Sequence, residues 1–450
     1  IFSQVLKPFG KVFDENLKGD ILIIGNNILN RDFGTVGNRA NDAYNATGSA
    51  SVYNEATNMK WINIDPDGTN NFNSSSASLT IPAASKACYK IAYAALYWSG
   101  TYSIAADRGS ASGADRSKIN QIRFKVGSNP YVNLVGNVIY DYVGVTGTPS
   151  GPLAPATAQA ARNPYACMLD VTSYIKAGGE TTYTVANIAS SEGGNGTSAG
   201  HSAGWTLFIA YEDPKLPGKY ITTYDGFTRI KSGDPAFTFP IDGFRTIPAG
   251  PVKAKLAFAT LEGDNRDTSI AGSVNERLTT PTIRPIVSGN PNSFNSSISV
   301  EDTNFTNRVP NSINTLGYDT GVLTLSNPSN NTIKNGETKA DITLATGSDW
   351  YYLFFTALSV DVIEPEIILT KRVLDKDDKD IGGQNVTFND VLNYVIRFQN
   401  VGNDDAQNFT IEDTLPINVV FNYPSDIYPL PAGVTVKSYD PVSRLLIFNV

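Results

Sequence analysis

Apolar and polar residues alternate with a period of two along most of the chain, and this pattern limits the fold more than any other feature. Examples are Ile119–Val126 (INQIRFKV), Thr181–Ile188 (TTYTVANI) and Lys253–Leu261 (KAKLAFATL). Successive side chains of a β-strand point to opposite faces, so this alternation is typical of strands buried on one side. Gly, Pro and Asn residues separate the runs, as turns require. The sequence therefore predicts an all-β protein of tandem β-sandwiches.

Helices are expected to be few and short. The segment Asp170–Lys176 predicts one, with Asp170 as its N-cap, and the Pro/Ala-rich stretch Pro152–Arg162 predicts another. No segment supports a helix of more than about ten residues.

The chain is expected to divide into an arm and two or three sandwiches. Residues 1–20 form a lead-in strand or arm, 21–213 a jelly-roll-like sandwich, and 214–364 either a second sandwich or the second half of one large sandwich. The turn Glu212–Gly218, punctuated by two prolines, is compatible with both alternatives. Residues 365–450 carry 12 acidic and 7 basic residues, which is −5 of the total charge of −8, and form a separate acidic module.

Scarce residue types exclude several classes of function. The chain has 1 His and 2 Cys, too few for a histidine-rich metal site, a four-cysteine zinc site or an iron–sulfur cluster. The net charge of −8 disfavours binding to nucleic acid. No apolar run reaches the roughly 18 residues of a membrane-spanning helix.

The C-terminal segment resembles a known repeat. Asp390–Tyr394 (DVLNY), Asn400–Gly402 (NVG) and Asp413–Pro416 (DTLP) match recurring features of an immunoglobulin-like or prealbumin-like sandwich, found in tandem in large bacterial surface proteins. The resemblance implies an immunoglobulin-like fold for residues 365–450. The chain stops within the strand-like run Leu445–Val450, so the repeat is expected to be incomplete. An open strand edge would then accept downstream repeats or neighbouring copies.

The N-terminal region is similar to another group of exported proteins. Cys88–Gly100 (CYKIAYAALYWSG) and Ala203–Lys219 (AGWTLFIAYEDPKLPGK) are similar to the N-terminal parts of long adhesin-like Bacteroidota proteins. Those proteins are cargoes of the type IX secretion system, many of them associated with gliding motility. The resemblance implies an extracellular, cell-surface location and partners in the secretion and surface-attachment machinery.

Two cysteines in an exported chain suggest a disulfide between Cys88 and Cys167. Two buried free thiols are the alternative.

Oxygen-bearing side chains in two Asp-rich turns suggest calcium, although solvated turns explain them as well. These side chains are Asp65, Asp67 and Asn70 in the first turn, and Asp375, Asp377 and Asp380 in the second. No other cofactor is expected.

Sugar recognition is a further candidate function. Trp350 and Tyr351 follow a Gly-Ser-Asp turn and could stack on sugar rings. A glycosidase needs two facing carboxylates, and Glu262 and Asp264 are one candidate pair. The segment Gly200–Gly204 (GHSAG) has the letters of a nucleophile elbow. However, a strand follows it and the only histidine, His201, lies inside it, so no catalytic triad is expected.

One modification is suggested by the second resemblance. Asp413-Thr414-Leu415 fits the short pattern at which Bacteroidota O-glycosylate exported proteins, so Thr414 is a candidate glycosylation site.

Together these features predict a non-enzymatic extracellular adhesin, the head and first stalk repeat of a longer protein that attaches to surfaces or glycans. One alternative is a structural subunit of a surface filament assembled by strand addition. The other is a carbohydrate-active enzyme.

Overall fold

The computed structural model confirms an all-β protein, with 51% of residues in strands and 4% in helices. The short helix expected near Asp170–Lys176 is α1 (Thr172–Gly178), and the one expected at Pro152–Arg162 lies outside the described residues. The structure describes residues 5–37, 39–45, 53–54, 57–102, 115–142, 163–193, 200–265, 277–280 (backbone only), 292–347, 350–363, 365, 367–402, 406 and 408–450.

The chain divides into unit 1, Ile1–Val362, and unit 2, Ile363–Val450. The described part of unit 1 includes the short 3-10 helices Arg116–Lys118 and Pro328–Asn330. Its strands are β1 (Val5–Asn27), β2 (Leu29–Arg31), β3 (Met59–Trp61), β4 (Ser74–Ser78), β5 (Lys90–Thr101), β6 (Gln121–Val126), β7 (Val132–Val135), β8 (Asn137–Asp141), β9 (Pro164–Asp170), β10 (Thr182–Ala186), β11 (Ala203–Glu212), β12 (Gly218–Lys231), β13 (Phe237–Asp242), β14 (Ala254–Gly263), β15 (Arg277–Thr280), β16 (Ile298–Val300), β17 (Thr303–Asn304), β18 (Arg308–Val309), β19 (Gly317–Thr324), β20 (Lys339–Ala345) and β21 (Trp350–Asp361).

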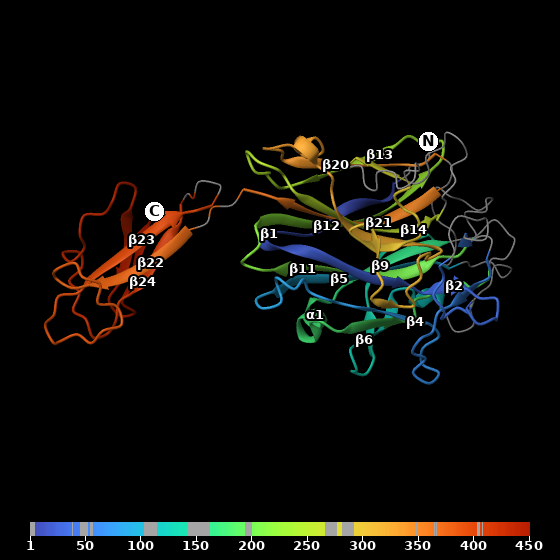
Figure 1. The fold of residues 1–450 in the computed structure, drawn as a ribbon, viewed down its shortest axis with the longest axis horizontal. Coiled ribbons are helices and arrows are strands. Elements are labelled where there is room, and N and C mark those ends of the chain that lie inside the picture. The colour runs from blue at the N-terminus through green and yellow to red at the C-terminus, as the bar shows by residue number, and fades with distance from the viewer. Residues whose placement is uncertain are drawn as a thin grey trace. The chain divides into compact units, whose positions relative to one another are not determined.

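The strands of unit 1 stack in four layers (Figure 1). Layer 1 is β13-β20-β15. Layer 2 is β17-β16-β19-β14-β21-β12 with the first half of β1, and layer 3 is the second half of β1 with β11-β5-β9-β8. Layer 4 is β18-β4-β10-β6-β7, and β2-β3 form a separate small pair. Layers 2 and 3 are hydrogen-bonded through β1 into one continuous sheet, which is folded over on itself.

The fold in this sheet lies in the middle of β1. Residues up to Lys18 pair with β12, whereas residues from Gly19 onward pair with β11. Phe208 on β11 lies 5.6 Å from Phe355 on β21, ring centre to ring centre, so the two halves must face each other. The turn needs a glycine, because a Cβ at Gly19 would lie 1.9 Å from the backbone oxygen of Tyr211. We call this end of unit 1 the arch end and the opposite end the distal end.

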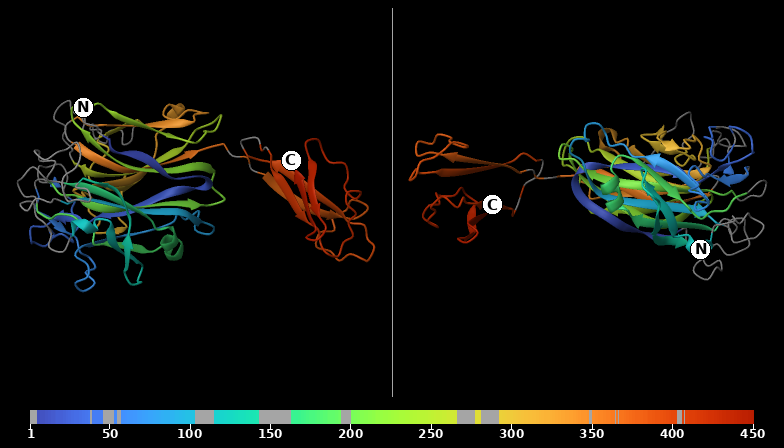
Figure 2. Two further views of the ribbon diagram at one scale, coloured as in Figure 1. Left: turned by 180° about the vertical axis from the view of Figure 1, so that it is seen from behind. Right: turned by 90° about the horizontal axis from the view of Figure 1, so that it is seen from below.

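Figure 2 shows the strands of unit 1 from two further sides. Three apolar cores separate the four layers, and aromatic rings make many of the contacts. Trp98 and Trp205 belong to the core between layers 3 and 4. Tyr97 and Phe355, 4.3 Å apart, join layers 3 and 2, and Phe258 belongs to the core between layers 2 and 1. This shared packing makes residues 21–213 and nearly all of 214–364 parts of one unit. Most of residues 1–20 belong to β1.

Asp20 holds an ion-pair cluster at the arch end. Its carboxylate lies 3.2 Å from the Lys219 ammonium and 2.8 Å from that of Lys255. Burial alone would raise the pKa of Asp20, but the two ammonium groups outweigh it and keep the pKa below its usual 3.8.

We therefore expect Asp20→Asn to destabilise unit 1 by about 3 kcal/mol at pH 7, because it leaves two partly buried lysines without their shared partner. The carboxylate contributes this stability fully above the unfolded-state pKa of 3.8, and loses it as pH falls through the lower folded-state pKa. Urea unfolding of both proteins between pH 7 and pH 2.5 measures the difference. A difference that does not shrink below pH 4 would contradict the assignment.

The described residues of unit 2 form two small sheets, β22-β23 and β24-β26-β25. The strands are β22 (Ile367–Leu374), β23 (Asn393–Asn400), β24 (Thr410–Thr414), β25 (Thr435–Asp440) and β26 (Leu445–Asn449). The buried apolar side chains described here are Ile411, Leu415 and Leu446. Many other large apolar side chains are exposed: Ile368, Leu369, Val386, Phe388, Val391, Val401, Ile417, Val420, Tyr423, Tyr428 and Val442. Unit 2 thus has a small core and an unusually apolar surface.

Candidate binding surface at the distal end of unit 1

Several chain connections begin and end at the distal end. Thr101, the last residue of β5, pairs with Pro164 at the start of β9, and Asp141 at the end of β8 pairs with Tyr165. In layer 2, Gly263 at the end of β14 pairs with Gly317 at the start of β19. Connections held on a rigid scaffold are where binding residues concentrate. The described residues that anchor these connections therefore define the candidate site.

Glu262 is the centre of one anchor cluster. Ser202 Oγ donates to Glu262 Oε1 at 2.5 Å, and the Asn54 side-chain amide lies 3.4 Å from both carboxylate oxygens. The backbone N–H of Ser202 donates to Thr101 Oγ1 at 3.1 Å, and that oxygen lies 3.4 Å from His201 Nδ1. All five residues are at most 4% exposed. The cluster joins layer 2 to layer 3 at the bases of the connections.

A β-bulge directs Glu262 into this cluster. The register between β14 and β19 shifts between Leu261 and Gly263, and Glu262 has a φ of +69°, in the left-handed region. A bulge of this kind redirects a side chain, and left-handed backbone in a residue other than glycine is strained. Gly263 is required beside it, since a Cβ there would lie 2.1 Å from Asp319 Oδ2.

The cluster brings together residues of two candidate sites that lie far apart in the sequence, the Glu262/Asp264 pair and the His201-Ser202 segment. The Ser202 hydroxyl donates to a carboxylate and is 1% exposed, a geometry that serves structural anchoring. The backbone oxygen of Asp264 accepts from Asn292 at 2.7 Å. A nucleophile needs access to its substrate, and Ser202 lacks that access in this arrangement.

Arg116 forms the second anchor cluster. One guanidinium nitrogen donates to the backbone oxygens of Tyr102 and Asn163, each at 2.9 Å, and the other pairs with the Asp141 carboxylate. The Arg116 side chain is 15% exposed and lies near the rings of Tyr102 and Tyr165. This residue therefore ties the ends of two connections to β8. Nothing in the sequence marked it, because its partners are far away along the chain.

Two large apolar side chains project from the segment that follows β2 at the same end. Phe33 is 52% exposed and Val36 is 85% exposed. The Arg31 guanidinium lies 4.7 Å from the centre of the Phe33 ring, which holds that ring in place. Exposed apolar groups beside rigid anchors are the usual composition of a recognition surface.

The predicted disulfide is not present, and both cysteines are free. Cys167 lies opposite Trp98 near the distal end of β5, whereas Cys88 precedes the start of β5 at Lys90. The strand between those points measures about 26 Å at the usual rise per residue, and a disulfide needs Cα atoms within about 7 Å. Cys88 Sγ instead donates to Asp213 Oδ1 at 3.2 Å. The disulfide prediction was wrong because it considered the number of cysteines and not their positions along a strand.

We expect the purified chain to show two titratable thiols when it is denatured without reductant. In the native state Cys167 should not react with a thiol reagent, because it is completely buried. Cys88 should react slowly at pH 7, since its hydrogen bond to Asp213 raises the pKa of the thiol. Thiol counting with and without denaturant measures both. A denatured chain without free thiols would restore the disulfide.

Neither predicted calcium site is formed. In the first turn Lys125 lies 2.7 Å from Asp65 and Arg123 lies 2.8 Å from Asp67, so both carboxylates form ion pairs with basic side chains. Asn70 in the same turn is exposed. Across the described part of the chain, no group of three or more His, Cys, Asp or Glu side chains is arranged to hold a metal ion.

The second Asp-rich turn is held by its own backbone. Asp375 Oδ1 accepts the backbone N–H groups of Asp377 at 2.9 Å and Lys379 at 3.0 Å. Asp380 accepts from Gly382 at 2.9 Å. These are the Asx contacts of a solvated turn, the alternative explanation of this segment.

Of the proposed sugar-stacking pair, Tyr351 is completely buried and packs against Phe294 at 4.7 Å, so this prediction was wrong for Tyr351. Trp350 is partly buried against the core between layers 2 and 3. The other candidate position, Thr414, is exposed at the end of β24. Its neighbour Asp413 is buried and lies 2.5 Å from the Lys371 ammonium. Glycosylation of Thr414 stays a prediction.

Fold and site together define a layered all-β unit followed by a small β module. A family model described as a domain of unknown function (DUF7619) matches residues 375–423, which lie entirely in unit 2 and include β23 and β24. No curated protein matches the chain. The described helices are too short and too polar to cross a lipid bilayer.

Proposed function

We propose that this chain is the ligand-binding head and first stalk module of an extracellular, cell-surface adhesin. Unit 1 presents the binding surface at its distal end, and unit 2 is the first spacer module. The protein acts by holding a surface or glycan ligand and has no reactive centre of its own.

One observation carries the proposal. The chain leaves unit 1 after β21, and Asp361 at the end of β21 pairs with Lys219 at the arch end. The Glu262 and Arg116 clusters, Phe33 and Val36 all belong to the opposite end of unit 1. In unit 1 the chain therefore leaves at one end, and the strand ends that anchor the candidate site lie at the other. β-Sandwich recognition domains have a similar arrangement, in which the binding loops gather at one end.

The sequence resemblances support the extracellular, cell-surface location. Two regions of unit 1 are similar to exported Bacteroidota adhesin-like proteins, and unit 2 resembles a repeat of large bacterial surface proteins. Type IX secretion, a link to gliding motility and partners in the attachment machinery belong to this proposal.

A second candidate is a surface filament in which neighbouring copies meet through unit 2. The observation that favours it is the apolar surface of that unit, where Phe388 is 93% exposed and Val442 is 91% exposed. An exposed apolar patch of this kind is a common sign of a protein–protein contact.

A pair of matched double variants tests both candidates. Phe33→Ala with Val36→Ala changes the distal end, and Phe388→Ala with Val442→Ala removes similar side chains from unit 2. If unit 1 is an adhesive head, binding of the labelled full chain to a glycan array and to solid surfaces should fall at least tenfold in the first variant only. Electron microscopy of the same samples should show isolated particles.

Other outcomes contradict the adhesin. Regular polymers that disappear in the unit 2 variant would establish the filament. Equal binding by both variants and the unmodified chain would show that the distal end is not the ligand surface. Release of sugars from the array, lost on Glu262→Gln, would establish an enzyme.

A further inference from the structure

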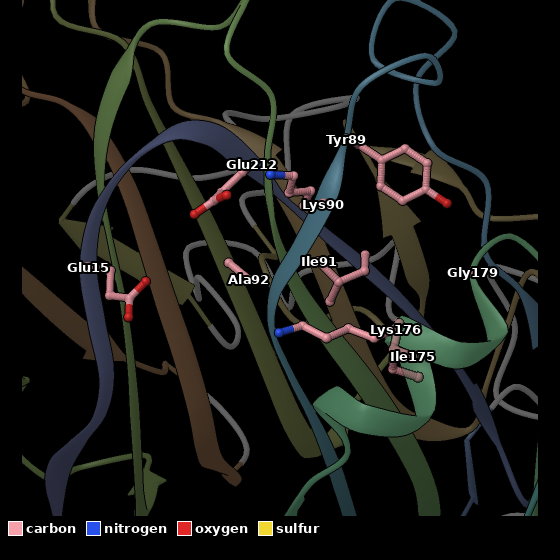
Figure 3. A pocket seen from close by; sticks show the side chains of 9 residues that line it. All are labelled: Glu15, Tyr89, Lys90, Ile91, Ala92, Ile175, Lys176, Gly179 and Glu212. Atoms are coloured by element: carbon pink, nitrogen blue, oxygen red, sulfur yellow. The ribbon is translucent and has the colours of Figure 1, made fainter. Parts of the chain in front are cut away.

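A pocket of about 540 Å³ lies at the arch end of unit 1, away from the proposed ligand surface (Figure 3). Glu15 of β1 and Glu212 of β11 line it together with Lys90 of β5 and Lys176 of α1. The other lining residues are Tyr89, Ile91, Ala92, Ile175 and Gly179. The volume falls within the range of small-ligand sites.

The charges around the pocket balance, and they are available to a ligand. Two carboxylates and two ammonium groups give a formal sum of zero. Figure 3 shows the Lys176 side chain extending from α1 toward the β1 side of the pocket, where Glu15 lies. All four side chains are exposed, and within the described structure none of them forms a hydrogen bond or an ion pair with another side chain.

The residues beneath these charges are apolar. Ile91 and Ile175 are buried, and the small side chain of Ala92 leaves space between the acidic and basic groups. Tyr89 is partly buried and adds an aromatic edge. Gly179 lies beside the Tyr89 hydroxyl, and its φ of +59° disfavours residues other than glycine.

We propose that this pocket binds a short peptide with free termini, a zwitterion with a small apolar body. Its ammonium end lies against Glu15, its carboxylate against Lys176, and its small apolar body on Ala92. Opposite charges at both ends give orientation and specificity, while the apolar floor contributes desolvation. The site is independent of the distal surface, so either proposal can fail alone.

Calorimetric titration of the full chain with trialanine tests this proposal. Trialanine with an acetylated N-terminus and an amidated C-terminus should bind at least tenfold more weakly, because it lacks both charges. Lys176→Glu should weaken the binding of free trialanine at least tenfold. The matched control Lys334→Glu, an exposed lysine elsewhere in unit 1, should leave binding unchanged.

A charge exchange makes the test sharper. Glu15→Lys combined with Lys176→Glu restores one charge of each sign, so it should recover much of the affinity that Lys176→Glu alone removes. Both substitutions are at exposed positions, so the fold should tolerate them. The proposal is overturned if the native chain does not bind trialanine at about 10 mM. It is also overturned if the blocked peptide binds equally well, or if Lys334→Glu causes the same loss as Lys176→Glu.

Discussion

Gly19→Ala should destabilise unit 1 by about 3 kcal/mol or more, a large effect for the addition of one methyl group. The new Cβ would lie 1.9 Å from the Tyr211 backbone oxygen and 2.5 Å from a Leu17 methyl carbon. A flexible side chain could move away, but the Tyr211 oxygen belongs to β11, which pairs with β1 at this point. The strain therefore affects the turn that joins layer 2 to layer 3.

Gly10→Ala is the matched control, since it adds the same methyl group to the same strand. A Cβ at Gly10 has no neighbour within 4 Å, so we expect unchanged or slightly higher stability. All 4 tryptophans of the chain, at positions 61, 98, 205 and 350, belong to unit 1, so their fluorescence during urea unfolding reports on that unit. Equal unfolding midpoints for the two variants would show that β1 does not turn at Gly19.

The strands could be predicted from the sequence, because alternation is a local property and each strand carries its own pattern. Lys253–Leu261, for example, is β14 almost in full. The arch could not be predicted in this way. Val5–Asn27 is one extended segment, and its change of partner from β12 to β11 depends on contacts with residues about 200 positions later in the chain. The boundary near residue 213 could not be decided for the same reason.

The candidate site shows the same limit. Glu262 and Ser202 could each be singled out as chemically interesting, but their hydrogen bond spans 60 residues and depends on a bulge in β14. Arg116 follows a stretch rich in small residues, 103–115, and only its carbonyl partners show its role. The calcium prediction failed because Lys125 and Arg123 meet the first Asp-rich turn from another strand.

The second large effect concerns the core between layers 2 and 3. Phe355→Ala should cost about 3–5 kcal/mol of the stability of unit 1, the usual cost of emptying a fully buried phenylalanine site. Phe355 is 0% exposed, and its ring lies 4.3 Å from Tyr97 and 5.6 Å from Phe208. Both partners belong to layer 3, so the loss falls on the contact between the facing halves of the folded sheet.

Phe33→Ala is the control for this prediction, because it removes the same side chain from a position in unit 1 that is 52% exposed. It loses a contact with Arg31 worth about 0.5–1 kcal/mol and should leave the unfolding midpoint almost unchanged. If both variants shift the midpoint equally, Phe355 does not bridge two layers and the sheet is not folded over. The anchors of layers 2 and 3 would then not meet at the distal end, and the adhesive head would lose its structural basis.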